Sequence, residues 1–222
     1  MNQDPDDCSL AAVPLFAPMS TSARLDLQQV SELRPFERGT VLGGQERDSL
    51  LVLLSGAVAL GVHEADRVAV LSTFRAPCVL NLACVMVQAD CEIRWRALQA
   101  GALLNLPGAT FRKALAGDPG LAARAISELA LAHQRLLSGA ASQRLRSSER
   151  RVAAYLLSLT AVTTGRVTVH LPYDKNLLAA LLGMTPENFS RAMGRLVELG
   201  VRVKGSDVSI EQVERLRADP AG

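Results

Sequence analysis

The chain has 222 residues, of which 49% are hydrophobic, with 24 Lys and Arg against 22 Asp and Glu. This composition is typical of a folded globular protein and argues against a long disordered tail. No stretch approaches the roughly 20 apolar residues that a membrane-spanning helix needs, and the acidic start MNQDPDDCSL is unlike a signal peptide. We therefore expect a cytoplasmic, two-domain protein whose cysteines are reduced: Cys8, Cys78, Cys84 and Cys91.

Basic residues are concentrated at one end of the chain. The residues after position 143 include 12 basic and 8 acidic side chains, a net charge of +4, whereas the earlier residues carry a net charge of −2. A basic bias confined to one end is typical of a nucleic-acid-binding module, although solubility alone can produce it. The charge distribution is therefore consistent with a nucleic-acid-binding module but does not by itself predict one.

The first half of the chain predicts a β-rich domain flanked by helices. A helix is expected over Thr21–Leu33, with Ser20 or Thr21 as its N-cap. The runs that follow are short, apolar or alternating, and separated by Gly, Pro and charged residues: Thr40–Leu42, Leu50–Leu54, Ala57–Val62, Val68–Leu71, Ile93–Leu98 and Ala102–Leu106. Regularly spaced short runs of this kind predict an antiparallel sandwich or barrel.

A long helix is predicted to begin where Asp118 can act as the cap and Pro119 takes the first helical position. Its apolar residues alternate at spacings of three and four: Ala122, Ala125, Leu129, Ala132 and Leu136. Such a seam can pair with a copy of itself or pack on the chain's own barrel, and the spacing leaves both open. The segment Gly139–Ser148, rich in Ser, Ala and Arg, predicts a hinge.

The last third of the chain contains the most informative pattern. A helix is expected over Glu149–Thr160 and a strand over Arg166–Leu171. The segment Asp174–Gly200 then reads as a capped helix, a glycine, and a second helix opened by Thr185 as N-cap and Pro186 at its first position. This is the pattern of a helix-turn-helix. The apolar residues of the second helix that we expect to face inward are Phe189, Met193, Leu196 and Val197.

The polar residues of the second helix are candidate DNA contacts. In a helix-turn-helix, the N-terminal turns of this helix enter the major groove and present side chains to base edges. A carboxylate accepts from cytosine N4 and an arginine forms two hydrogen bonds with guanine, and Glu187 and Arg191 share one face. The alternative is an ordinary ion pair within the helix. The candidates are Thr185, Glu187, Asn188, Ser190, Arg191 and Arg195.

The segment after Gly200 predicts a β-wing. Two alternating strands, within Val201–Ile210, flank a Gly-Ser-Asp turn. Arg202 and Lys204 on the first strand would lie near the phosphate backbone, where basic groups add affinity without choosing a sequence.

The segment Arg150–Ile210 resembles the DNA-binding domain of the CRP/FNR family of transcription regulators, and Pro14–Phe16, Phe36–Thr40 and Leu51–Val58 are similar to the barrel of that family. The resemblance implies an α+β chain with a jelly-roll-like β-barrel sensor domain over residues 1–117. A dimerisation helix and hinge over 118–143 and a winged helix-turn-helix over 144–222 would follow. It also implies a homodimer through the 118–143 helix, with double-stranded DNA and RNA polymerase as partners.

Three residues of the second helix distinguish between branches of this family. Glu187, Ser190 and Arg191 match the Glu-x-x-Ser-Arg pattern of the FNR branch rather than the Glu-x-x-Gly-Arg of the cyclic-AMP receptor. The match implies a palindrome with TTGA-type half-sites.

The sensor domain lacks the phosphate-binding pattern of the cyclic-nucleotide members of the family. Those members use a Gly-Glu pair and an Arg followed by Ser or Thr, but no glycine occurs here between Gly61 and Gly101. Arg94 and Arg96 then read as strand-surface charges, and cyclic AMP is not expected. Only Cys8 lies near the amino terminus, so the iron–sulfur cluster of FNR is not supported.

The sequence does not identify the effector, and it allows several roles for Cys78, Cys84 and Cys91. These cysteines read as buried small hydrophobes, as thiol redox sensors or as axial ligands of haem, because the family includes haem-based gas sensors. His63 and His133 are further candidate ligands. The apolar lining around the cysteines would accommodate haem but would equally form core: Val79, Leu80, Leu82, Val85 and Met86.

A second hypothesis is a thiol- or ligand-binding protein of the same fold that does not regulate DNA. The basic residues expected to be exposed on the helix and wing favour DNA binding over this alternative: Arg191, Arg195, Arg202 and Lys204. The sequence has no HExxH motif, no phosphate-binding glycine loop and no nucleophile elbow, so we do not expect an enzyme.

Overall fold

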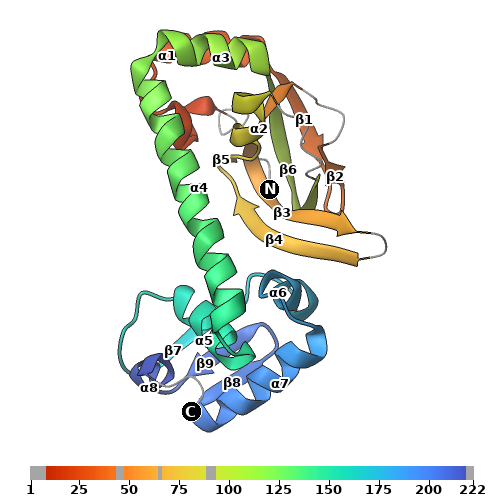
Figure 1. Ribbon diagram of the computed structural model, residues 1–222, viewed down its shortest axis with the longest axis vertical. Helices are drawn as coiled ribbons and strands as arrows, with labels where there is room; N and C mark the ends of the chain where they lie inside the picture. Colours follow the sequence, from red (N-terminus) through yellow and green to blue (C-terminus); the bar gives the residue numbers. More distant parts are fainter. Residues whose placement is uncertain (1–8, 44–47, 65–66, 89–93, 219–222) are drawn as a thin grey trace. The chain divides into compact units, whose positions relative to one another are not determined.

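The computed structural model describes residues 9–43, 48–64, 67–88 and 94–218 (Figure 1). The chain divides into two compact units, residues 1–134 and 135–222, and each combines helices with an antiparallel sheet. Within the described residues, no helix is both long and apolar enough to cross a membrane. The mixed α+β class predicted from the sequence is confirmed.

The first unit is built on a six-stranded antiparallel sheet. Its strands are β1 (Glu32–Phe36), β2 (Val41–Leu42), β3 (Ser49–Glu64), β4 (Arg67–Arg75), β5 (Cys78–Val79) and β6 (Arg94–Pro107). The main order is β1-β6-β3-β4, with β2 on β6 and β5 on β3. The expectation of separate short strands is wrong for β3 and β6, because each is one long, irregular strand that covers two of the predicted runs.

Two glycines explain why β3 and β6 can continue through their irregular section. Gly56 has a φ of +88°, and a Cβ added there would lie 2.7 Å from the carbonyl oxygen of Ala100. A Cβ on Gly101 would lie 2.2 Å from the carbonyl oxygen of Ser55. The register between the strands shifts over this same stretch, from Leu53 to Val58. The glycines therefore allow two backbones to approach closely and do not end the strands.

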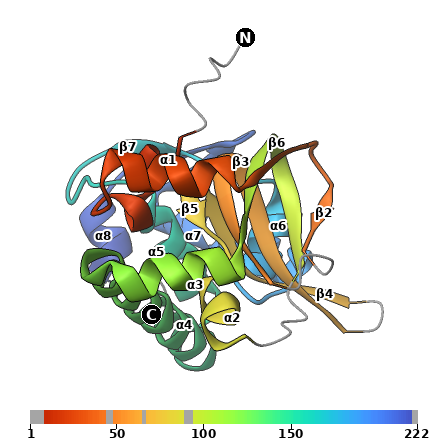
Figure 2. The ribbon, with the colours of Figure 1, turned by 90° about the horizontal axis from the view of Figure 1, so that it is seen from above.

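Short helices cover one face of this sheet. They are η2 (Leu10–Ala12), η3 (Pro14–Phe16), α1 (Thr21–Gln29), α2 (Leu82–Val87) and α3 (Gly108–Gly117). Ser20 caps α1 as predicted, but α1 ends at Gln29 and Leu33 lies in β1, so the predicted helix was too long. Helices α1 and α3 lie at the same end of the unit (Figures 1 and 2).

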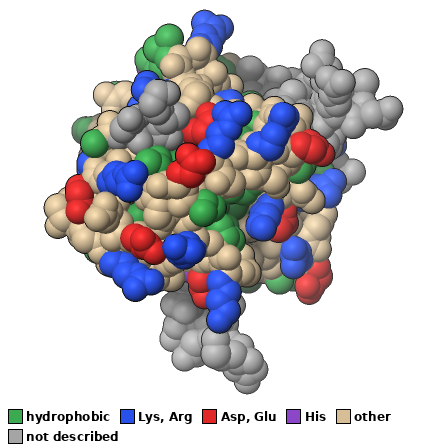
Figure 3. Space-filling model, turned by 90° about the horizontal axis from the view of Figure 1, so that it is seen from below, with side chains coloured by type: hydrophobic (Ala, Val, Ile, Leu, Met, Phe, Trp, Pro, Cys, Tyr) green, Lys and Arg blue, Asp and Glu red, His purple; other side chains and the backbone are tan. Residues whose placement is uncertain are grey.

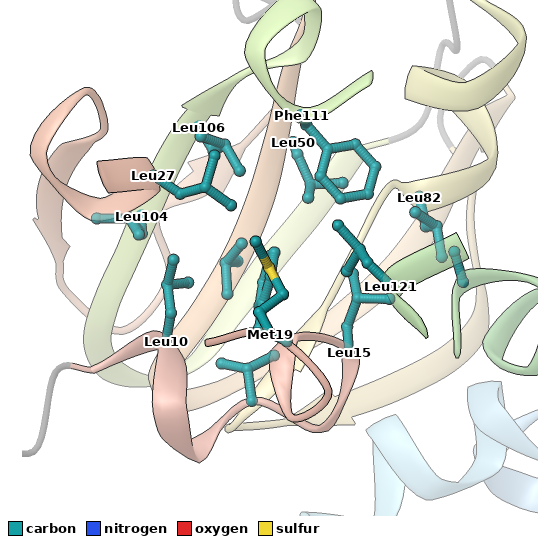
Figure 4. Packing of buried hydrophobic residues seen from close by; sticks show 14 of the residues in the cluster. Leu10, Leu15, Met19, Leu27, Leu50, Leu82, Leu104, Leu106, Phe111 and Leu121 are labelled. Atoms are coloured by element: carbon teal, nitrogen blue, oxygen red, sulfur yellow. The ribbon is translucent and has the colours of Figure 1, made fainter. Parts of the chain in front are cut away.

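The core of the first unit has two parts because residues alternate across β3. Leu50 and Val52 point to the cluster under the helices, whereas Leu51 and Leu53 belong to a second cluster with Trp95. Figure 4 shows leucines from the sheet and the helices converging with Phe111 in the first cluster. Strand β3 therefore buries hydrophobic residues on both faces of the sheet.

The long helix α4 (Pro119–Leu145) has 27 residues. Asp118 caps it through a bond from the backbone N–H of Leu121 to Asp118 Oδ1, at 3.0 Å. Leu121 and Ala125 are buried in the core of the first unit, whereas every residue from Ala130 to Ala141 is exposed. The predicted hinge at Gly139–Ser148 is largely wrong, because the helix continues through Gly139 to Leu145.

The second unit packs its helices on a small sheet. After α4 come α5 (Ser148–Ser158), β7 (Val167–His170), α6 (Lys175–Leu181), α7 (Pro186–Leu196), η4 (Val197–Leu199), β8 (Val201–Lys204), β9 (Asp207–Ile210) and α8 (Val213–Ala218). The sheet order is β7-β9-β8. Phe189, Met193 and Leu196 lie in its core as predicted, but Val197 is 50% exposed and does not face inward.

Candidate nucleic-acid interface

The turn between α6 and α7 is fixed by caps on both sides. Asp174 Oδ1 accepts a hydrogen bond from the backbone N–H of Leu177 at the start of α6, at 2.9 Å. Gly183 takes a φ of +64° in the turn, a left-handed conformation that favours glycine. Thr185 then caps α7 by accepting from the backbone N–H of Asn188 at 3.3 Å, with Pro186 at the first helical position. The predicted helix-turn-helix is confirmed.

One face of α7 is buried and the other is polar and exposed. Phe189, Ala192 and Leu196 are at most 1% exposed, so they fix the rotation of the helix about its axis. On the opposite side, the structure brings together the exposed side chains of the predicted site: Glu187, Ser190 and Arg191. Asn188, predicted to point away from the core, is half-buried.

The exposed side chains at the start of α7 are linked to one another. The Arg191 guanidinium donates a hydrogen bond to Asn188 Oδ1. Hydrogen bonds from its own backbone N–H and from the Thr185 hydroxyl, with the charge of Arg191, hold the pKa of the Glu187 carboxyl below its usual value. Glu187 therefore stays ionised and can only accept hydrogen bonds. An acceptor and a cationic donor stand side by side on the exposed face of one helix.

Arg195 differs from the other candidates on α7. Its Nη1 atom donates to Glu149 Oε1 at 2.6 Å, and Glu149 is a buried residue at the start of α5. The guanidinium predicted to face DNA is therefore held by a neighbouring helix. No local pattern in the sequence marks this partner, because Glu149 precedes Arg195 by 46 positions.

Arg151 is a second residue of this region that the sequence did not single out. Its Nη1 atom donates to the carbonyl oxygens of Leu182 and Gly183, at 2.6 and 3.1 Å. Carbonyls at the end of a helix have no partner within the helix, so a side-chain donor stabilises the turn. No local pattern marks Arg151 for this task, because its partners lie more than 30 residues away.

The strands β8 and β9 form the predicted wing, with Gly205 in the left-handed region at their turn. Lys204 is exposed, and Arg202 is exposed but pairs with Glu211 through Nε and Oε1 at 3.1 Å. At the tip, His170 Nδ1 lies 2.7 Å from Asp207 Oδ1. Figure 3 shows Lys and Arg side chains spread over the face that it views, with Asp and Glu side chains among them.

Comparison with known proteins agrees with this geometry. Residues 150–219 match the Crp-like helix-turn-helix domain. The chain is 29% identical over 196 residues to the "Probable transcriptional regulator flp" of Lacticaseibacillus casei, which covers 85% of this chain and 86% of that protein. It is also 27% identical to the structure of a candidate cyclic nucleotide binding protein from Ruegeria pomeroyi, with a TM-score of 0.58 and 96% of each chain covered.

These matches support a CRP/FNR-type transcription regulator. A CooA mutant from Carboxydothermus hydrogenoformans shares its fold, with a TM-score of 0.78, 15% identity, and coverage of 97% of this chain and 99% of that one. The α+β fold of the present chain is the predicted one, a cyclic-nucleotide-binding-like β domain followed by a helix-turn-helix of the DNA-binding type.

The described sensor residues predicted from the sequence lie on different elements of the first unit. Cys78 lies on β5 as a free thiol, packed against the core cluster that contains Trp95. Cys84 lies on α2 and is disulfide-bonded, so the expectation of reduced cysteines is wrong for this residue. Cys91 lies outside the described residues. His63 lies on β3, and the structure does not describe its side chain.

Burial makes Cys78 a poor thiolate. Burial, with the negative charge of Glu128 on α4, raises the pKa of the Cys78 thiol to about 11. Haem ligation and disulfide exchange both require the thiolate, so neither is favoured at this residue. Leu82 and Val85, predicted as core or as pocket lining, are buried in the first cluster. Among the described residues, no group of three or more His, Cys, Asp or Glu is placed to hold a metal ion.

Proposed function

We propose that this protein is a dimeric regulator that binds a palindrome of TTGA-type half-sites through α7. The observation that carries the proposal is the exposed row Glu187, Ser190 and Arg191 on the first turns of a capped helix whose other face is buried. Glu187 would accept from cytosine N4 and Arg191 would donate to guanine O6 and N7. We propose RNA polymerase as a further partner, as the resemblance to the family implies.

The half-site spacing follows from the geometry of a two-fold dimer. Two recognition helices that enter successive major grooves on one face of DNA are about 10 base pairs apart. The palindrome TTGA-N6-TCAA has this separation between its half-site centres. Titration of the protein against this duplex and a scrambled duplex of equal composition tests the proposal. We expect at least about a thousandfold preference for the palindrome, and equal affinities would contradict the proposal.

The exposed part of α4 supports a dimer. Ile126 and Leu137 are 65% and 57% exposed, and they lie about three turns apart on one face, with Ala130 and His133 between them. A stripe of this kind on a long helix, apolar except for His133, is suited to pairing with a second copy.

This stripe lies on a different face from the seam predicted from the sequence. In that seam, Ala125 is buried in the chain's own core and Leu129 packs against it, whereas Leu136 is 61% exposed. We assign the dimer contact to the stripe that contains Ile126 and Leu137.

A charge in this stripe should separate the two copies. Leu137→Glu would bury a carboxylate in an apolar seam, so we expect the dimer dissociation constant to rise by at least about tenfold. Leu131→Glu is the matched control, because Leu131 is 44% exposed but points away from the stripe. Sedimentation equilibrium would measure both constants. An unchanged dimer in Leu137→Glu would refute this seam.

We further propose that the effector is not cyclic AMP and that the sensor responds to thiol chemistry at Cys84. The disulfide at Cys84 is the observation that favours a thiol input over haem. A dithiol reductant would reduce this disulfide to two thiols while its own thiols become a disulfide. The free Cys78 does not take part, because its raised pKa keeps it protonated.

The thiol input predicts a redox-dependent affinity for DNA. Wild type is expected to change its affinity for the palindrome by at least about fivefold between untreated and dithiothreitol-treated protein, the lower end of the usual range of coupling between two sites. Cys84→Ser should give one affinity under both conditions, whereas Cys78→Ser should respond as wild type does. A response that persists in Cys84→Ser, or is missing from wild type, would exclude Cys84 as the sensor.

A further inference from the structure

The ion pair between Arg195 and Glu149 joins the recognition helix to the first turn of α5. The two atoms Arg195 Nη1 and Glu149 Oε1 are 2.6 Å apart, and the exposed fractions of the two side chains are 72% and 10%. Arg195 follows Arg191 by one turn of α7, so sequence spacing places both on the same side of the helix. In the structure, Arg195 instead reaches toward a buried carboxylate.

Glu149 is itself held in place as an anion. Hydrogen bonds from its own backbone N–H and from the Ser147 hydroxyl, with the Arg195 guanidinium, hold the pKa of the Glu149 carboxyl below its usual value. Its position in the first turn of α5 also favours a negative charge. A buried carboxylate without a cationic partner is unfavourable, so Glu149 keeps Arg195 close to α5.

The same turn of α5 also holds the other end of the helix-turn-helix. Arg151 donates to the carbonyls of Leu182 and Gly183, just before α7 begins. Gln143, near the end of α4, packs against Gly183, where an added Cβ would lie 2.9 Å from its Nε2 atom. Residues of α5 therefore contact α7 near its C-terminal end and the turn before its N-terminal end. Two such contacts define the direction of the helix axis.

We propose that Arg195 is a positioning residue, held by Glu149 to set the orientation of α7, and that it does not contact DNA. The inference rests on the proposed function, because it concerns how α7 is presented to the major groove. Loss of the pair would leave Glu187 and Arg191 on the helix but change the angle at which they meet the base edges. The ion pair between Arg195 and Glu149 thus affects DNA recognition indirectly, through the positions of Glu187 and Arg191.

A double-mutant cycle with salt titration tests this proposal. Glu149→Gln, Arg195→Gln and the double variant are titrated against the TTGA palindrome over a range of salt concentrations. We expect each single variant to bind about tenfold more weakly, and the double variant to bind no more weakly than the poorer single, because coupled residues are not additive. Arg195→Lys, which keeps one donor to Glu149, should recover part of the affinity only when Glu149 is present.

The salt dependence distinguishes positioning from phosphate contact. Each phosphate contact contributes about 0.9 to the slope of log affinity against log salt, so loss of one contact per protomer lowers the slope of a dimer by about 2. Arg195→Gln should leave the slope unchanged. Lys204→Gln on the wing is the matched control, and it should lower the slope.

Two results would overturn the proposal. The first is a lower salt slope in Arg195→Gln, with the same loss of affinity whether residue 149 is Glu or Gln, since Arg195 would then contact phosphate directly. The second is wild-type affinity in both single variants. Circular dichroism confirms that each variant is folded, and Arg195→Lys serves as the conservative test if the Gln variants unfold. A wild-type protein that does not prefer the palindrome would instead refute the proposed function.

Discussion

Arg191→Ala is expected to abolish most of the preference for the TTGA palindrome. Arg191 is exposed on α7 and its guanidinium is oriented by Asn188 and lies near Glu187. A bidentate contact between arginine and guanine contributes about 1–3 kcal/mol of discrimination, and a palindrome contains two such contacts. We therefore expect the dimer to lose about 2–6 kcal/mol of specific binding free energy, measured by competition titration.

The control for this prediction removes the same charge elsewhere. Arg217→Ala on α8 changes an exposed arginine outside the helix-turn-helix, so it should leave the preference intact. Binding of Arg191→Ala to scrambled DNA should fall much less than binding to the palindrome. An equal loss on both duplexes would mean that Arg191 contacts phosphate and does not read bases.

Phe189→Ala is expected to destabilise the DNA-binding unit by about 3–5 kcal/mol, the usual range for truncation of a buried phenylalanine. Phe189 is 1% exposed and packs in the core of the second unit with residues from α5, α6 and the sheet. Chemical denaturation, followed by circular dichroism, would measure the free energy of unfolding. DNA binding should be lost wherever this unit is unfolded.

Val197→Ala provides the matched control for this variant. Val197 directly follows α7 but is 50% exposed, so its truncation should change the unfolding free energy by less than about 0.5 kcal/mol. The unfolding transition of the first unit should remain at its wild-type position in both variants. Equal destabilisation by the two substitutions would contradict the assignment of Phe189 to the core.

The helix-turn-helix could be predicted from the sequence because its signals are local. Thr185 and Pro186 mark the start of α7 within two positions, and the apolar residues of that helix recur at helical spacing. Gly183 marks the turn through its backbone conformation. Such features depend on neighbours within a few residues, so the order of elements in this part of the chain was predicted correctly.

The sheet of the first unit was harder to predict, because glycine has more than one role. Gly56 and Gly101 look like turn residues in the sequence, but they lie on adjacent strands and allow a close approach of two backbones. Gly139 looks like a hinge, but the flanking Leu, Ala and Ser residues continue α4 through it. The pairing partner of a glycine decides its role, and the sequence alone does not name that partner.

The candidate site was predicted in composition but not in its long-range contacts. Glu187, Ser190 and Arg191 are exposed on one helix, as their spacing indicates. The capture of Arg195 by Glu149 depends on how α5 packs against α7, and no local pattern encodes that geometry. A residue predicted from spacing alone to contact DNA can therefore instead hold the recognition helix in position.

Selection of DNA from a random-sequence library by the wild-type protein would test the central claim most directly. We expect enrichment of two inverted TTGA half-sites with centres about 10 base pairs apart, because α7 of each copy would enter a major groove on the same face of the duplex. Arg191→Ala should lose the preference at one position of each half-site. A selected pool without inverted repeats, or the same repeats in Arg191→Ala, would contradict the account.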